Sequence, residues 1–227
     1  RDYAGRRVAG PTYPFQRERF WFQDGLQAAT RTQMLAGAPV AHPLLDARLV
    51  SPAIEGSAFQ SVLSPKQPGW LGDHRVRGHA VVPGAAFVEL MMAAAQEALP
   101  WGRSQLFNVE FQRPLVLDDD APTTIQVLVS PVRDGAARAR VVSAWTAEGE
   151  TTWFTHAVAS VRPATPVDAE QLVLPAEQDQ AVELAALYNG YEGRGISYGP
   201  AFRRLEAAWL RDGTAVGRVV LPAERAT

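Results

Sequence analysis

The chain has 227 residues, of which 47% are hydrophobic and 20% are charged, and its net charge at neutral pH is −2. This composition is ordinary for a globular protein, and the length suffices for one sizeable hydrophobic core or two small ones. The charge gives no electrostatic case for binding nucleic acid or an anionic membrane, and the absence of cysteine excludes disulfides, thiol nucleophiles and cysteine-bound metals.

The positions of the histidines and the lengths of the apolar segments further limit the class of protein that this sequence can encode. The four histidines, at positions 42, 74, 79 and 156, lack the close spacing of a metal site, so no metal is expected. No apolar stretch reaches the roughly 18 residues that a transmembrane helix requires, and no apolar targeting segment is evident at the start. These features predict a cytoplasmic protein.

Residues 1–41 are predicted to be a linker or arm. The segment 11–21 combines two prolines, four aromatic residues and alternating charges, which is typical of an extended arm whose rings pack on a neighbouring domain. Residues 23–41 are rich in alanine, glutamine and threonine and are interpreted as a loose connector.

Residues 42–163 are predicted to form a first domain of strands around one helix. The helix should begin after Pro83, which suits a first helical turn, and end near Leu99, before Pro100. It has few charged or amide residues, so we expect it to be buried on nearly all sides. Strands are expected at 48–54, 57–63, 79–82, 106–111 with 115–117, 124–130, 139–145 and 152–161.

The remainder is predicted to contain a linker and the start of a second domain. Residues 164–177 hold two prolines, Pro166 and Pro175, directly after Pro163, and are assigned to the linker. In 178–227 we expect a helix over 178–188, an irregular glycine-rich segment over 191–200, and a strand pair at 205–210 and 214–221.

A possible reaction centre surrounds the start of the first helix. His74 lies nine residues before the Pro83-Gly84 step and is a candidate base. The Gly84 N–H has no acceptor inside the helix and lies at the positive end of the helix dipole. A base near a carbonyl-polarising amide is what removal of an α-proton from a thioester requires.

Several motifs resemble those of dehydratase domains in modular polyketide synthases. His74, Gly78 and Pro83 match the family's His-x-x-x-Gly-x-x-x-x-Pro pattern, and the segment 198–202 resembles its Tyr-Gly-Pro-x-Phe motif. The segments 42–45 and 70–74 resemble the family's start and its approach to the histidine. The arm at 11–21 resembles the linker that follows the acyltransferase in these synthases.

The resemblance implies an α+β hot-dog fold: the first half of a double hot-dog, and the start of the second half from residue 178. It also implies dehydration of a β-hydroxyacyl group carried on the phosphopantetheine of an acyl carrier protein, without a further cofactor. His74 would be the base, with Gly84, Tyr198, Gly199 and Pro200 at the oxyanion or substrate site and Gly78 and Pro83 as structural motif residues. The other domains of the synthase are expected partners.

The resemblance also implies a general acid, an aspartate in the second hot-dog, that no motif of this sequence supplies. Asp46 is not assigned this role, and Asp73 and Glu89 are poor substitutes because one adjoins the base and the other lies within the helix. We therefore expect the chain alone to be weak or inactive and to need a complementary C-terminal half, because one acid commonly contributes ~10²–10⁴ in rate.

Two other interpretations remain open at this point. One is a sibling activity on the same scaffold, such as double-bond isomerisation or cyclisation, which also uses the histidine. The other is a non-catalytic remnant that docks a carrier protein or a partner domain. A thioesterase is less favoured, because its acid would have to be Glu89 and the Tyr-Gly-Pro motif would be unexplained.

Overall fold

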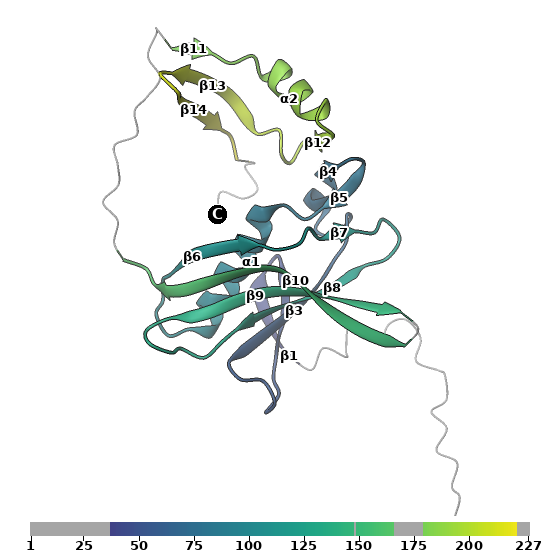
Figure 1. Cartoon of the computed structure of the whole chain (residues 1–227), viewed down its shortest axis with the longest axis vertical. Coiled ribbons are helices and arrows are strands. Elements are labelled where there is room, and N and C mark those ends of the chain that lie inside the picture. Colours follow the sequence, from purple (N-terminus) through teal and green to yellow (C-terminus); the bar gives the residue numbers. More distant parts are fainter. Residues whose placement is uncertain (1–36, 148, 166–178, 222–227) are drawn as a thin grey trace, which may run out of the picture. The chain divides into compact units, whose positions relative to one another are not determined.

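One helix, α1 (Gly84–Ala98), lies across one face of a curved antiparallel sheet in the computed structural model, which describes residues 37–147, 149–165 and 179–221 (Figure 1). Pro83 precedes the helix in extended conformation, as a helix-initiating proline should. The sheet-facing residues Ala86, Phe87, Leu90, Met91, Ala94 and Ala95 are buried. The expectation of burial on nearly all sides was wrong, because Ala85, Glu89 and Gln96 are exposed.

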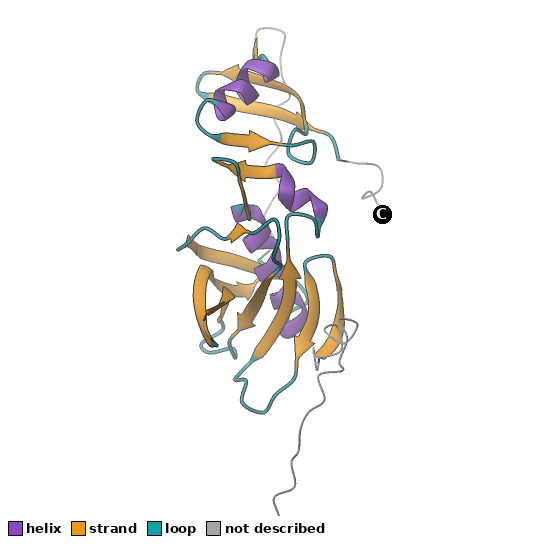
Figure 2. Cartoon of the chain, turned by 90° about the vertical axis from the view of Figure 1, so that its right-hand side faces the viewer, coloured by secondary structure: helices purple, strands orange, loops and turns teal. Residues whose placement is uncertain are grey.

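The large sheet has seven strands in the order β1-β2-β3-β8-β9-β10-β6, and all neighbouring pairs are antiparallel. Figure 2 draws the strands in orange and the helices in purple. Its strands are β1 (Gly37–His42), β2 (Leu45–Leu49), β3 (Ser57–Leu63), β6 (Ser104–Phe111), β8 (Thr123–Val129), β9 (Ala137–Ala147) and β10 (Glu150–Pro163). Alternate residues of β8, namely Ile125, Val127 and Val129, are at most 1% exposed. This confirms the period-two pattern expected there and places the core between sheet and helix.

The start of the sheet differs from the expectation. Strand β1 begins at Gly37, inside the range assigned to the linker, and the strand expected at 48–54 is instead β2, ending at Leu49. Pro39 is tolerated in β1 because an edge strand need not donate all its N–H groups. Pro52 has no N–H to donate to a neighbouring strand, which disfavours a strand through residue 52. Leu45 is buried, and the strand therefore begins there, before the expected range. Residues 1–36, including the arm at 11–21, lie outside the described residues.

A smaller sheet has the strand order β12-β4-β5-β7 and joins segments distant in sequence. It consists of β4 (His74–Val76), β5 (His79–Val81), β7 (Val116–Leu117) and β12 (Ile196–Tyr198). A short 3₁₀ helix, η3 (Gly69–Asp73), leads into β4. The segment 191–200, expected to be irregular, therefore contributes a strand.

A third sheet, of order β11-β13-β14, is formed by the C-terminal segment. Its strands are β11 (Gln180–Ala181), β13 (Leu205–Arg211) and β14 (Thr214–Val219), which confirms the expected pair. The helix α2 (Leu184–Glu192) begins later than predicted, because Gln180 and Ala181 pair with β13. Residues 166–178, most of the expected linker, lie outside the described residues. No helix in the described ranges is both long and apolar enough to cross a bilayer.

Candidate active site

His74 is the first residue of β4, and its imidazole is held by the neighbouring strand β5. Its Nδ1 lies 2.7 Å from the carbonyl oxygen of Val81. Because a carbonyl can only accept, Nδ1 must carry the proton and donate it. In the neutral ring Nε2 then has a free lone pair, and no described residue forms a hydrogen bond with it. The histidine is therefore held in the tautomer that a base requires.

The turn that brings Val81 opposite His74 is a two-residue hairpin. Val76 pairs with His79, and between them Arg77 and Gly78 have φ angles of +51° and +84°. Two successive positive φ values are typical of a type I′ turn, in which glycine avoids the steric cost of a side chain. Gly78 thus forms the turn of the hairpin that positions the histidine.

The Tyr-Gly-Pro-x-Phe segment packs directly on His74. Strand β12 pairs antiparallel with β4, and Tyr198 lies opposite His74. The ring centroids of Tyr198 and Phe202 lie 5.6 Å and 5.4 Å from the imidazole centroid. The ring centroid of Trp70 lies 6.2 Å from that of Phe202. The structure therefore brings together two motifs that are more than one hundred residues apart in sequence.

Gly84 occupies the first position of α1 and follows Val81 by only three residues. An extended span of three residues covers at most about 11 Å, so the helix N-terminus begins close to the carbonyl that binds His74. Among the described residues none accepts a hydrogen bond from the Gly84 N–H, which leaves this donor available. A Cβ at Gly84 would lie 3.2 Å from Cζ of Phe111, so an aromatic ring borders this terminus.

Gly199 lies against Asp73, which precedes His74 in sequence, and the Gly199 amide is already engaged. Its N–H donates to the backbone oxygen of Asp73 at 2.7 Å, and the N–H of Ala201 donates to Oδ2 of Asp73 at 2.8 Å. Gly199 thus has a structural hydrogen bond in place of a free donor, whereas Pro200 is exposed. The role of Asp73 in this junction carries no sequence motif of its own and is apparent only from the contact.

The three carboxylates considered as general acids all have protein partners. Asp46 is exposed and accepts a hydrogen bond from the Val62 N–H at 2.9 Å. The Oε1 atom of Glu89 lies 3.1 Å from Nε2 of His42, on the exposed side of α1. Asp73 binds Ala201. None of these contacts directs a carboxylate toward His74.

The other histidines are arranged differently from His74. His79 is exposed, and His42 bridges Glu89 and the Leu44 N–H. His156 is 2% exposed, with Nε2 2.8 Å from Ser143 Oγ and Nδ1 3.1 Å from the Arg113 carbonyl. Burial lowers the pKa of His156 below its ordinary value, and the charge of Arg113 acts in the same direction.

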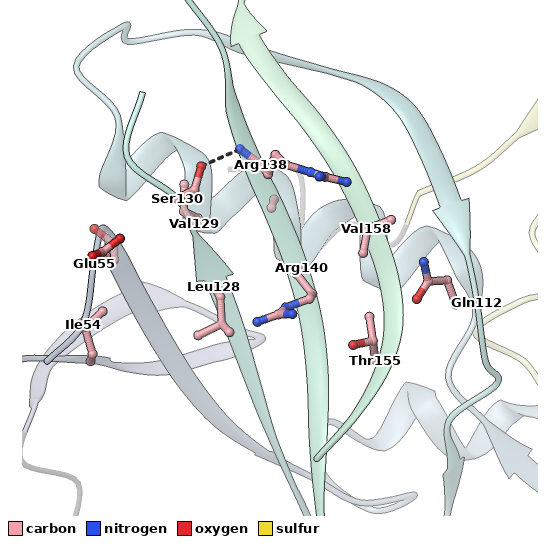
Figure 3. Close-up of a pocket in the computed structure, with 12 residues that line it drawn as sticks. Ile54, Glu55, Gln112, Leu128, Val129, Ser130, Arg138, Arg140, Thr155 and Val158 are labelled. Carbon is pink, nitrogen blue, oxygen red and sulfur yellow. Dashed lines mark hydrogen bonds between the residues drawn. The ribbon is translucent and has the colours of Figure 1, made fainter. Parts of the chain in front are cut away.

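A hollow of about 590 Å³ lies on the outer face of the large sheet and is separate from this site (Figure 3). Arg138 and Arg140 project from β9 along it, with Glu55, Gln112 and Thr155 on the other walls. None of the residues around His74 lines it. The wall mixes polar and apolar residues and contains no histidine, so it offers no imidazole base, and His74 with the N-terminus of α1 remains the candidate reaction centre.

The fold and the candidate site together indicate the class of protein to which this chain belongs. One long helix wrapped by an antiparallel sheet is the arrangement of the hot-dog fold, and the unbonded imidazole nitrogen of His74 near the helix N-terminus is its candidate acid–base group. The base can remove an acidic C–H proton, and the amide can stabilise the oxyanion that develops.

Comparisons with known proteins identify the family. A model of the polyketide synthase dehydratase domain matches residues 42–144, and one of the polyketide synthase dehydratase N-terminal domain matches residues 166–227. The dehydratase domain from the terminal module of the rifamycin polyketide synthase is 30% identical with a TM-score of 0.71, and the match covers 85% of this chain and 69% of that one. The erythromycin dehydratase is 28% identical, also with a TM-score of 0.71, over 85% and 71% of the two chains.

The chain therefore belongs to the polyketide synthase dehydratase family, and its fold is the hot-dog fold of that family. It is also 36% identical over 217 residues to the mycoketide-CoA synthase of Mycobacterium tuberculosis. That match covers 94% of this chain but 5% of the synthase. Related sequences thus occur as small parts of much longer synthases.

Proposed function

We propose that this chain contributes the base and the oxyanion donor for dehydration of a β-hydroxyacyl thioester to the α,β-unsaturated thioester. The observation that carries the proposal is the bond from Nδ1 of His74 to the Val81 carbonyl, which leaves Nε2 as the acceptor. The unoccupied N–H of Gly84, three residues after Val81, supports the second role. Membership of the dehydratase family supports the reaction class.

In the proposed reaction Nε2 of His74 accepts the α-proton. The electron pair of the broken C–H bond forms the Cα–Cβ double bond, and the Cβ–O bond breaks. The hydroxyl group leaves as water after it receives a proton from a general acid. The Gly84 N–H donates to the thioester oxygen while negative charge develops there, and the helix dipole adds to this stabilisation.

The substrate in this proposal is carried on the phosphopantetheine arm of an acyl carrier protein, and no further cofactor takes part. Aromatic rings border both the proposed base and the proposed oxyanion donor, and this apolar surrounding favours an acyl chain as the substrate. Tyr198 and Phe202 lie against the imidazole, and Phe111 lies beside Gly84. The other domains of a polyketide synthase are the proposed partners, because related sequences are embedded in such synthases.

We place the general acid outside the residues that the structure describes. Asp46, Asp73 and Glu89 each have a protein partner that directs the carboxylate elsewhere. A complementary C-terminal part of a dehydratase is the proposed source. The described residues would then perform the proton-abstraction half of the reaction, with water loss depending on the added part.

The experiment that tests this proposal separates the two halves of the reaction. The chain is incubated in D₂O with a β-hydroxyacyl carrier protein, and mass spectrometry records α-deuterium incorporation and loss of one water. We expect His74-dependent deuterium exchange with little water loss, and increased water loss when the C-terminal part of a related dehydratase is added. His74→Asn should abolish exchange, whereas His79→Asn, which changes an exposed histidine of the same hairpin, should not.

Each alternative result has a defined meaning. Exchange that persists in His74→Asn would contradict the assignment of the base. Rapid water loss by the chain alone would contradict the external acid. Migration of the double bond in an unsaturated substrate, with no dehydration under any condition, would favour an isomerase. Carrier-protein binding with neither exchange nor water loss would favour a docking role.

A further inference from the structure

Asp73 joins the strand that carries His74 to the segment that covers it. Its backbone oxygen accepts the Gly199 N–H at 2.7 Å, and its carboxylate accepts the Ala201 N–H at 2.8 Å. The two acceptors belong to one residue, and the two donors are two residues apart. This double attachment fixes both the position and the direction of the 199–201 segment.

Gly199 permits this close approach. A Cβ at Gly199 would lie 2.4 Å from Cγ and Oδ1 of Asp73 and 2.8 Å from its Cβ. Such contacts are too short for any side chain, so Asp73 and a larger residue at 199 are mutually exclusive in this geometry. The Asp73 side chain thus occupies the space that the missing Gly199 side chain leaves.

The attached segment carries both rings that contact the imidazole. Tyr198 immediately precedes the first donor, and Phe202 immediately follows the second. The two rings are stacked with an interplanar angle of 21° and centroids 6.0 Å apart, and both lie within 5.6 Å of the His74 centroid. The carboxylate contact at Ala201 immediately precedes Phe202, whereas Tyr198 is also held by the pairing of β12 with β4, so loss of the Asp73 side chain would release mainly the Phe202 ring.

We infer that Asp73 is a positioning residue: it fastens the Tyr198–Phe202 segment to the His74 strand and so holds the imidazole of the base between its strand and two aromatic rings. This assignment goes beyond the proposed function, which gave Asp73 no role, and its catalytic consequence rests on that function. The geometric part is independent of any reaction, because it concerns a contact between two segments of the folded chain.

The test uses the full chain and reads the His74 ring by NMR. Ring protons of His74 should show cross-peaks to Phe202 and ring-current shifts from both aromatic rings. We expect Asp73→Ala to remove the cross-peaks and return the shifts toward those of an exposed histidine. Asp73→Asn should retain both, because its amide oxygen can still accept the Ala201 N–H. Gly199→Ala, which keeps Asp73 but removes the space, should resemble Asp73→Ala.

Asp46→Ala is the matched control. Asp46 also accepts a backbone N–H through Oδ2, from Val62 at 2.9 Å, but its contact joins β2 to β3. This variant should leave the His74 signals unchanged. Unaltered cross-peaks in Asp73→Ala, an equal change in Asp46→Ala, or a loss in Asp73→Asn as large as in Asp73→Ala would each overturn the inference.

Deuterium exchange then links the position to the reaction. We expect Asp73→Ala to slow α-exchange by up to about 100-fold, since a misplacement of 1 Å can have an effect of this size, and Asp73→Asn to restore much of the rate. If wild-type protein shows the cross-peaks but no exchange, the proposed function fails while the positioning contact stands. If exchange occurs and is unaffected by Asp73→Ala, the positioning role fails while the proposed function stands.

Discussion

The imidazole of His156 is stacked on the ring of Phe87, with the two planes 9° apart and the centroids separated by 5.9 Å. The contact joins β10 to the core-facing side of α1. The Arg113 carbonyl accepts the proton of Nδ1, so Nε2 accepts from the Ser143 hydroxyl. His156 is thus a neutral, fully hydrogen-bonded residue of the core, in contrast to His74 with its free Nε2.

This burial predicts a loss of stability in mild acid. The pKa of His156 is lowered in the folded protein, whereas in the unfolded chain it is near 6.5. Below pH 6.5 the unfolded state therefore binds a proton that the folded state does not. The free energy of unfolding should fall by up to about 1.4 kcal/mol per pH unit, from pH 6.5 down to the folded pKa.

Chemical denaturation at a series of pH values checks this expectation. His156→Phe should reduce the slope between unfolding free energy and pH in that window, even though the lost hydrogen bonds lower stability overall. The slope is the readout, so the absolute destabilisation does not confuse the result. An unchanged slope would assign the acid sensitivity to other groups.

Gly84→Pro should remove the oxyanion donor while keeping the helix. Proline suits the first helical position, and Pro83 has ψ of 149°, which is compatible with a following proline. Gly84→Ala is the matched variant, because it also adds a Cβ near Phe111 but retains the N–H. Phe111 is 57% exposed and can move aside. We expect α-exchange to fall by ~10²–10³ in Gly84→Pro and to change little in Gly84→Ala, with similar circular dichroism for both.

Gly78→Ala should weaken both the fold and the reaction. At φ of +84° an alanine incurs about 1–2 kcal/mol, although nothing lies within 4 Å of the added Cβ. Gly135→Ala is a matched control, since Asp134 and Gly135 form the same kind of positive-φ turn between β8 and β9. Thermal unfolding should show similar losses for the two variants. Only Gly78→Ala should slow α-exchange, because only that turn joins β5 to the strand that contains His74.

Arg75 should stabilise the His74 hairpin through backbone acceptors more than through its ion pair. Its guanidinium donates to the carbonyl oxygens of Gly72 and Gly78 and to Asp119. The Asp119 side chain is 61% exposed, so Asp119→Asn should change the unfolding free energy by less than 1 kcal/mol. Arg75→Ala should cost more in the same denaturation experiment. Equal losses would indicate that the ion pair dominates.

Local patterns were sufficient for most of the elements. The Pro83 start predicted α1, and the alternation at Ile125, Val127 and Val129 predicted β8, because these signals arise from neighbouring residues. The motif around His74 also identified the family. The ends of the sheets were less predictable: β1 and β11 are edge strands, and pairing with a single neighbouring strand decides whether such segments become strands.

The candidate base and the candidate oxyanion amide could be predicted from the sequence, because motif spacing and helix-start chemistry are local, and the resemblance carried by those motifs implied the fold class. Three contacts became apparent from the folded chain: Nδ1 of His74 donates to Val81, Tyr198 and Phe202 lie against the imidazole, and Asp73 accepts from Gly199 and Ala201. These contacts depend on the pairing of β4 with β12, strands more than one hundred residues apart. Long-range strand pairing is set by the packing of the whole fold, so no local sequence signal specifies it.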